Sequence, residues 1–343
     1  MTYKPGDVIL ANEPFALAVA VKMIPVVCSW CLKTTKEVPL SVCAGCKTLK
    51  YCSSTCQKED WSKGPHKNEC KYLKYQIVPG QTRLICRIIF KLRAGLGDAE
   101  YQLPDGTKTS YNKTIGHASH VLSKGDGTQE LASTWKSVKE FMGKDSQGLY
   151  DKVREAHCKI ERNRDLYLDN EGVPVADGLN LLSAVATHSC YPNAVYSGVG
   201  RKMELRCIRK IEKFSDVRTS YYHNVFDHPR SVRRAMLWAS HNFHCRCDEC
   251  EMKNPGAKER EASRDKPFRC GPCKRRGQKP SYCLDCTALG SDEEFWVRTL
   301  NDEETLERIT EYAHYLLLLI QHQSLAIFLA LHYRGFCLCG RPY

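Results

Sequence analysis

The chain has 343 residues and carries 51 Lys and Arg against 39 Asp and Glu, a formal net charge of +12. It also has 20 cysteines, whereas disulfide scaffolds of secreted proteins are as a rule short and begin with a signal peptide. Because the opening Met1-Thr2-Tyr3-Lys4-Pro5-Gly6-Asp7 has no apolar stretch, we expect an intracellular protein whose cysteines hold zinc.

The first 27 residues predict strand and turn. Val8 to Leu10 precede a turn at 12–14, and the apolar run 15–21 is typical of a buried strand. The next segment, 28–70, is dense in Cys and Lys and poor in long apolar runs. We therefore expect metal to replace a conventional core there.

Helical spacing of apolar residues dominates 81–160. It predicts three helices, which cover in turn 84–92, 131–142 and 149–160. Between the first two, the stretch 101–127 is polar and rich in glycine, which predicts a long surface loop.

Strand patterns return over 161–225. Met203, Leu205 and Cys207 alternate with charged residues, which predicts one strand, and a second short strand is expected over 219–222. Helices are then expected over 230–239 and 292–333. The apolar segment 313–333 within the latter favours a buried helix pair over a membrane span, because His314 and the run 321–323 interrupt it.

Eight soft metal ligands lie within 28–70 and come in short-spaced pairs. Zinc prefers four nitrogen or sulfur ligands in a tetrahedron, so eight ligands predict two sites. The spacing favours interleaving, with one ion held by Cys28, Cys31, Cys52 and Cys56 and the other by Cys43, Cys46, His66 and Cys70. A redox Cys-x-x-Cys is disfavoured, because that motif is a single pair beside a βαβ unit.

This segment resembles a MYND zinc finger. The similarity includes the run from Tyr51 to Trp61 and the closing His66-Lys67-Asn68-Glu69-Cys70. The resemblance implies a finger that binds protein partners, often proline-rich peptides. The alternative is a finger that only stiffens the fold.

Further cysteines form two more clusters. Three follow the pattern Cys245-x-Cys247-x2-Cys250, which is one ligand short of a tetrahedral site. Either that site is open or its fourth ligand comes from elsewhere, and Cys190 is a candidate. The last cluster predicts a four-cysteine ribbon, with ligand exchange or two free pairs as the alternatives, and consists of Cys270, Cys273, Cys283 and Cys286.

Five cysteines remain outside these clusters. Cys86, Cys158 and Cys207 sit beside apolar positions, which favours small core residues. Cys337 and Cys339 stay ambiguous.

Cys190 lies in Thr187-His188-Ser189-Cys190-Tyr191-Pro192-Asn193, which resembles the Asn-His-Ser-Cys-x-Pro-Asn motif of SET methyltransferases. In that family this cysteine completes the zinc site of a later C-x-C-x2-C. The order of segments over 4–286 is similar to the SET and MYND domain-containing (SMYD) family of protein-lysine methyltransferases.

The resemblance implies an α+β fold, in which a MYND zinc finger and a helical insert interrupt a β-rich SET-like core. A post-SET zinc site, the ribbon and a short helical tail follow. We expect the N-terminal part of the SET core, without the first Gly-rich strand, at 1–27 and the finger at 28–70. The insert would cover 71–160, and the C-terminal part of the SET core 161–225. The zinc sites would follow at 226–286, and a short, truncated tail at 287–343.

The resemblance further implies an S-adenosylmethionine-dependent protein-lysine N-methyltransferase of the nucleus and cytoplasm, acting on histone or non-histone proteins. Asn163 and Thr187 would contact the cofactor, the latter in place of an asparagine at its methionine portion. His188 would meet the adenine through its backbone, and Phe243 would stack on it. Tyr221 matches the tyrosine that borders the transfer channel.

The chemistry explains these residue types. A lysine amine attacks a sulfonium methyl group, but a free lysine has a pKa of about 10.4 and must first lose its proton. A narrow aromatic channel lowers that pKa by desolvation, and the Tyr221 hydroxyl can orient the amine. Tyr222 and Phe226 could form further walls. No catalytic metal is required, so the zinc ions would be structural.

Departures from the family keep a second function open. The sequence begins after the position of the Gly-rich strand, His241 stands where a second channel tyrosine is usual, and 214–216 replaces a Gly-Glu-Glu turn. The alternative is therefore a non-catalytic SET/MYND scaffold that recruits protein partners in transcriptional regulation. The basic run 274–276 supports only weak, nonspecific nucleic-acid contact.

Overall fold

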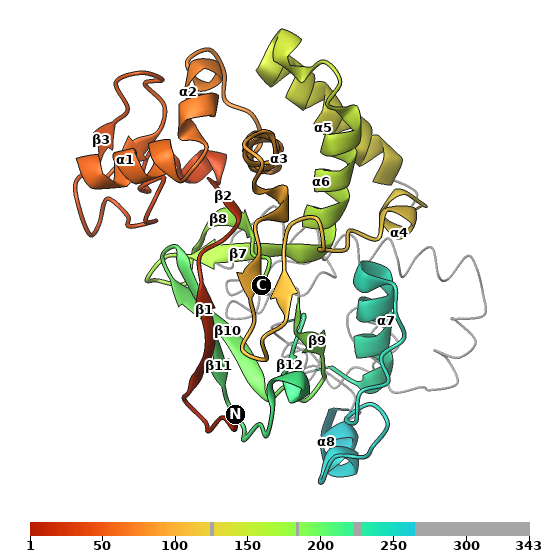
Figure 1. Cartoon of the computed structure of the whole chain (residues 1–343). Coiled ribbons are helices and arrows are strands. Elements are labelled where there is room, and N and C mark those ends of the chain that lie inside the picture. The colour runs from red at the N-terminus through yellow and green to blue at the C-terminus, as the bar shows by residue number, and fades with distance from the viewer. Residues whose placement is uncertain (124–126, 183–184, 223–227, 265–343) are drawn as a thin grey trace, which may run out of the picture. The chain divides into compact units, whose positions relative to one another are not determined.

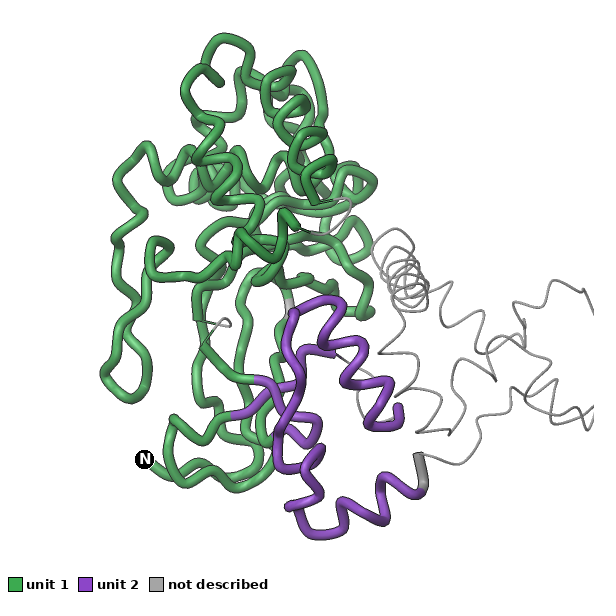
Figure 2. Tube along the Cα trace, turned by 90° about the vertical axis from the view of Figure 1, so that its right-hand side faces the viewer, with its two compact units in different colours: residues 1–187, 193–217 green, residues 188–192, 218–343 purple. Residues whose placement is uncertain are grey.

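A computed structural model describes residues 1–123, 127–182, 185–222 and 228–264 (Figure 1). The described residues form two compact units, 1–187 with 193–217, and 188–192 with 218–264 (Figure 2). The expected ribbon, the helical tail, Phe226, Cys337 and Cys339 lie outside the described residues. No helix in the described ranges is both long and apolar enough to cross a membrane.

Two antiparallel three-stranded sheets form the β part of the first unit. One has the order β1-β11-β10, and its strands are Val8–Asn12, Lys202–Cys207 and Ala194–Val199. The other has the order β2-β8-β7, with strands Ala16–Val19, Pro174–Leu179 and Arg164–Leu168. The mixture of helices and small sheets confirms the α+β expectation. The alternation predicted around Leu205 is also confirmed, because every second side chain of β11 is buried.

The helices α1 to α6 of the first unit lie in the finger and the insert. The finger contains α1 (Ser54–Ser62), α2 (His66–Leu73) and a two-stranded ribbon of β3 (Ser41–Val42) with β4 (Lys50–Tyr51). The insert contains α3 (Gly80–Arg93), α4 (Ala118–Ser123), α5 (Gly127–Met142) and α6 (Tyr150–Asn163). Short 3-10 turns lie at η1 (Val21–Met23), η2 (Leu96–Asp98), η3 (Gly143–Ser146) and η5 (Phe214–Asp216).

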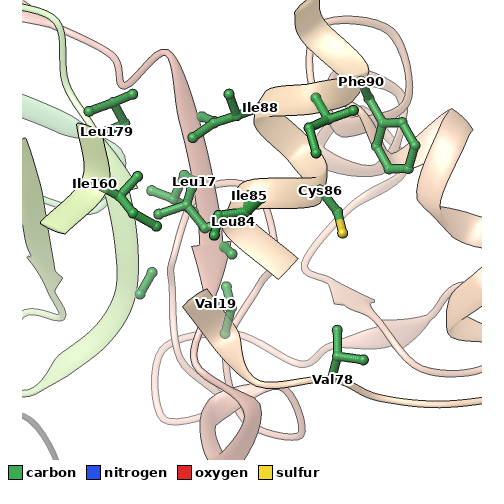
Figure 3. Packing of buried hydrophobic residues seen from close by; sticks show 14 of the residues in the cluster. Leu17, Val19, Val78, Leu84, Ile85, Cys86, Ile88, Phe90, Ile160 and Leu179 are labelled. Atoms are coloured by element: carbon green, nitrogen blue, oxygen red, sulfur yellow. The ribbon is translucent and has the colours of Figure 1, made fainter. Parts of the chain in front are cut away.

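The core of the first unit lies between α3 and the sheet of β2. Leu84, Ile85 and Ile88 of α3 are fully buried and share one apolar cluster with Leu17 and Val19 of β2 (Figure 3). These residues recur at helical spacing, so one face of α3 is apolar and packs inward. The expectation that Cys86, Cys158 and Cys207 are small core residues is confirmed, since each is at most 1% exposed.

The stretch 101–127, expected to be a long loop, contains regular secondary structure among its described residues. It forms a small hairpin of β5 (Tyr101–Gln102) with β6 (Lys108–Thr109), and then α4. Gly106 closes the hairpin with a φ of 85°, which glycine adopts readily. Tyr111 anchors the segment, because it is fully buried and stacks on Phe15 with ring centroids 5.3 Å apart. Such widely spaced anchors leave no periodic pattern in the sequence.

The composition of the finger suggested that metal replaces a conventional core there, but the finger also has buried apolar residues. Leu32, Leu49 and Tyr51 are buried and belong to the same apolar cluster as β2 and α3. Metal therefore adds to a shared core instead of replacing one.

Four charged side chains join the finger to this core, and each is at most 1% exposed. Arg83 donates from Nη2 to Glu69 Oε1 at 3.0 Å, and Arg87 donates to both Glu69 and Asp60. The same guanidinium groups also bond to the backbone of β2. Arg87 Nη1 donates to the Leu17 carbonyl at 2.8 Å, and Arg83 donates to the Val19 carbonyl. Two carboxylates of the finger thus face two guanidinium groups of α3.

The network is electrostatically matched. Burial opposes ionisation of Glu69, but the charges of Arg83 and Arg87 hold its pKa well below its usual value. Burial likewise opposes the charge on Arg87, and Asp60 and Glu69 raise its pKa. A buried ion pair of this kind adds little net stability, but removing one partner strands the other charge.

The substitution Glu69→Gln is expected to lower the free energy of unfolding of the zinc-loaded protein by about 3–5 kcal/mol, because two buried guanidinium groups lose a charged partner. Since the folded pKa of Glu69 is depressed, its contribution is present at neutral pH and is lost as the pH falls below about 4. Urea denaturation monitored by circular dichroism measures both effects.

Glu59→Gln is the matched control. Glu59 pairs with Lys63 at 2.7 Å on the surface of α1, so its loss should cost less than about 1 kcal/mol. Equal losses in the two variants would contradict the role given to Glu69.

The second unit is smaller. Its helices are α7 (Arg230–His241) and α8 (Ala257–Arg264), and Asn242, which caps the C-terminus of α7, has a φ of 57°. The short strand β12 (Arg218–Thr219) pairs with β9 (Thr187–His188), of which only His188 belongs to this unit. The predicted strand over 219–222 is therefore shorter than expected and begins one residue earlier.

Candidate functional site

The first ligand group of the finger joins a turn at 28–31 to the start of α1. The Sγ atoms of Cys31 and Cys52 lie 3.5 Å apart, as do those of Cys52 and Cys56, and Cys28 completes the group. Ser53 caps α1 by accepting from the Cys56 backbone N–H at 3.1 Å, which fixes the first turn of the helix. Four thiolates converge, as a tetrahedral zinc site requires.

The second group uses three cysteines and a histidine. His66 Nε2 lies 3.4 Å from Cys43 Sγ, and Cys46 and Cys70 complete the set, whose ligand atoms all lie within 4.8 Å of one another. The other ring nitrogen of His66 lies 3.4 Å from Glu69 Oε1. A carboxylate on the far nitrogen of a zinc-bound histidine fixes its tautomer and orientation. Glu69 therefore serves both the metal site and the buried ion network.

Each Cys-x2-Cys pair of this region is followed by a left-handed residue. Leu32 has a φ of 67° and donates its N–H to the Cys28 carbonyl, and Lys47 has a φ of 59° and donates to that of Cys43. The sequence did not mark these turns, because neither residue is a glycine. Gly45 has a different reason to be small, since a Cβ there would lie 2.9 Å from Cys70 Sγ.

The second unit holds a third ligand group. Cys190 is brought together with the three later cysteines, and its Sγ lies 3.6 Å from that of Cys250 and 3.9 Å from that of Cys245. The Cys190 N–H also points to Cys247 Sγ at 3.4 Å. The sequence left open whether this site is open or takes a fourth ligand from elsewhere. The structure places Cys190 beside the three later cysteines as that fourth ligand.

A buried arginine accompanies this group. Arg233 of α7 is 1% exposed and points Nη2 at Cys250 Sγ, 3.8 Å away, and at Glu261 Oε2 of α8, 3.0 Å away. Four thiolates around one Zn²⁺ leave excess negative charge, which a neighbouring guanidinium offsets. Arg233 could not be singled out from the sequence, beyond its place in a predicted helix.

An aromatic cluster lies beside the third group, in the same unit. It contains His188, Tyr221, His241 and Phe243, and the ring centroids of its contacting pairs lie between 4.8 and 6.4 Å apart. Tyr221 is 40% exposed, whereas the Tyr222 hydroxyl donates to the Met236 carbonyl of α7 at 2.7 Å. Of the two tyrosines, Tyr221 is therefore the more exposed, and the hydroxyl of Tyr222 is already engaged.

His188 links the cluster to the cysteines. Its Nδ1 accepts the Tyr221 backbone N–H at 3.1 Å, so its Nε2 carries the proton that faces Cys190 Sγ at 3.3 Å. Burial lowers the pKa of His188 to about 4, so the ring is neutral at physiological pH. The sequence assigned only the backbone of His188 a role, yet its side chain fixes the backbone of Tyr221.

The two remaining predicted cofactor contacts lie in the first unit. Asn163 ends α6, where its side-chain amide donates to the carbonyls of Ile115 and Lys159 at 3.0 and 2.9 Å. Thr187 is exposed in β9. Both stay predictions that depend on the resemblance.

Comparisons with known proteins find similarity both in the finger and over most of the chain. A family model for the MYND finger matches residues 28–70. The chain is 27% identical to the histone-lysine N-methyltransferase ASHR1 of Arabidopsis thaliana, covering 85% of this chain and 62% of that protein. It is 28% identical to the histone-lysine N-methyltransferase SMYD3 of Homo sapiens, covering 74% and 58%, and 26% identical to the human N-lysine methyltransferase SMYD2, covering 74% and 57%.

The chain thus spans about three fifths of the length of the curated relatives it matches. The MYND finger, the convergent cysteine groups and this similarity support assigning the chain to the SET and MYND domain-containing family. Zinc binding is supported by the same finger and cysteine groups.

The substitution Cys43→Ala is expected to release one zinc ion per chain, because three ligands hold the metal far less tightly than four. It should also destabilise the finger strongly, since zinc binding supplies about 10–16 kcal/mol in isolated fingers. Metal analysis after dialysis, together with thermal unfolding, measures the two effects.

Cys86→Ala is the control, because Cys86 is buried in α3 outside every ligand group. It should keep the full zinc content and lower stability only modestly. A full zinc content in Cys43→Ala would show that Cys43 is not a ligand.

Proposed function

We propose that this protein is an S-adenosylmethionine-dependent protein-lysine N-methyltransferase that acts on histone or non-histone proteins. The aromatic cluster beside the third cysteine group carries the proposal, in a chain similar to proteins named as lysine methyltransferases. The zinc ions are structural in this proposal, because all four positions of each group are taken by cysteine or histidine.

We propose that the aromatic cluster binds the adenine part of the cofactor. The rings of Phe243 and His188 are half-buried, with centroids 6.1 Å apart and planes inclined by 58°, and a flat purine can stack on the face of one of them. Within the second unit, the proposed contacts are Phe243 and His188. When bound, the cofactor supplies a sulfonium methyl group that a neutral amine can attack.

Tyr221 has the properties that the transfer step needs. Partial burial raises the pKa of its hydroxyl, so the hydroxyl is protonated at neutral pH and can donate or accept a hydrogen bond. Its ring and that of His241 have centroids 4.8 Å apart. We propose that these rings shield the substrate ammonium from water, which favours loss of its proton, and that the Tyr221 hydroxyl orients the resulting amine.

Tyr221→Phe is expected to lower methyl transfer to histones or other protein substrates by about 10–100-fold, because a desolvated amine left without its hydrogen-bond partner costs about 1–3 kcal/mol. Phe243→Ala should instead weaken cofactor binding by about 10–100-fold, because one stacking contact is worth about 1–3 kcal/mol. Incorporation of labelled methyl groups and calorimetry with S-adenosylmethionine measure the two effects separately.

Tyr75→Phe is the matched control, since Tyr75 is 81% exposed in the first unit, and it should change neither quantity. Absence of cofactor binding by the unmodified protein at millimolar concentration would refute methyl transfer. The scaffold function would then be favoured, provided that partner binding persists.

The MYND finger is a protein-interaction module, and we propose that it binds proline-rich peptides. Trp61 of α1 is 41% exposed, although its ring edge contacts His66 with centroids 5.8 Å apart. Proline-rich segments keep a preformed extended helix and dock on aromatic surfaces of this kind.

Trp61→Ala is expected to weaken binding of a proline-rich peptide by about 30-fold, the loss typical of an aromatic anchor. Trp238→Ala is the control, because Trp238 is 48% exposed on α7 of the other unit. Fluorescence anisotropy with a labelled peptide measures both. Equal affinity in the two variants would exclude Trp61 as the contact.

We further propose that the protein acts in the nucleus and cytoplasm as a regulator of chromatin. Its net charge of +12 supports weak, salt-sensitive contact with nucleic acid alongside its protein substrates.

A further inference from the structure

Helices α5 and α6 of the first unit bring together three side chains that no zinc cluster includes. Glu130 comes from α5, and His157 and Glu161 lie four residues apart on α6, so they share one face of that helix. Their carboxylate oxygens and an imidazole nitrogen all lie within 4.8 Å of one another. The two helices pack against each other (Figure 1).

His157 is the unusual member of this group. It is 0% exposed, and no hydrogen-bond partner for either ring nitrogen is present among the described residues. The large majority of buried polar side-chain atoms have such a partner, and leaving one unsatisfied costs about 1–3 kcal/mol. A histidine that served only to fill the core would normally direct one nitrogen at a backbone carbonyl. Here the imidazole instead faces two carboxylates.

Glu161 is held in place from a third helix. Gln81, in the first turn of α3, donates from Nε2 to Glu161 Oε1. Carboxylates that bind metals are commonly oriented by such outer hydrogen bonds. Glu130 is exposed, so an ion can reach the group from solvent.

We propose that Glu130, His157 and Glu161 bind a divalent first-row transition-metal ion, with water at the remaining positions. One imidazole and two carboxylates suit divalent ions from manganese to zinc, whereas the thiolates of the cysteine groups select softer ions such as zinc. The ion neutralises the two carboxylates, satisfies the buried imidazole and joins α5 to α6. It is distinct from the zinc ions of the finger and of the second unit.

The test uses the full chain with its thiolate sites loaded with zinc. Mn²⁺ stands below Zn²⁺ in affinity for any one site and disfavours thiolate, so it should not displace the zinc already bound. Calorimetric titration with Mn²⁺, and in parallel with added Zn²⁺, should reveal one binding event per chain. The same ion should raise the thermal midpoint of the protein.

His157→Gln and Glu161→Gln should each weaken this event at least about tenfold, since even residues behind the ligands affect metal affinity by that much. Glu140→Gln is the matched control, because Glu140 is an exposed carboxylate of α5 outside the group, and it should leave the affinity unchanged.

The proposal is overturned if neither ion binds the unmodified protein, or if Glu161→Gln binds it as tightly as the unmodified protein does. Should His157→Gln fail to fold, Glu130→Gln and Glu161→Gln decide the question, because neither carboxylate is buried. Methyl transfer plays no part in these measurements, so their outcome is independent of the proposed activity.

Discussion

The pairing of two carboxylates with two guanidinium groups, away from water, constrains the whole first unit. Asp60 and Glu69 belong to the finger, whereas Arg83 and Arg87 belong to α3, so neither segment can satisfy its buried charges alone. The same arginines donate to carbonyls of β2. The finger is therefore packed into the first unit and is not a separate module on a linker. Its metal site is connected through Glu69 and the two arginines to β2 and hence to the β2-β8-β7 sheet.

The metal groups share one principle of support, although they lie in different units. In the finger, a carboxylate stands behind the histidine ligand, and this orients a neutral ring. In the second unit, where all four ligands are cysteines, Arg233 stands beside Cys250 and offsets the excess negative charge. The outer partner in each case has the sign that the ligand set requires. The sites were inferred from the spacing of the cysteines, and that spacing does not indicate Glu69 or Arg233.

The sequence predicted what depends on local spacing. Cysteine pairs, the apolar face of α3 and the alternation in β11 are periodic, so the zinc groups, the main helices and that strand could be inferred. Charged residues in a helix are by default read as solvated, so the burial of Asp60 and Arg87 could not be inferred. The hairpin after α3 was missed because Tyr111 is a lone anchor without a pattern around it.

The candidate site in the second unit was predicted by type and position, and less well by role. The aromatic residues were identified from a family pattern, and the structure brings His188, Tyr221 and Phe243 together. The bond from the Tyr221 backbone to the His188 ring depends on the three-dimensional path of the chain. No short-range pattern in the sequence records such a contact.

The pairing of β2 with β8 has a consequence for how the chain reaches its fold. Ala16 pairs with Leu179, more than 160 residues later, and the finger and the helical insert occupy the interval. Closing so long a loop costs conformational entropy before any strand contact forms, which slows folding. A finger that has already bound its metal shortens the flexible part of that loop and presents Asp60 and Glu69 to α3. Metal supply during synthesis would then govern the rate at which the β2-β8-β7 sheet assembles, as well as the final stability of that sheet.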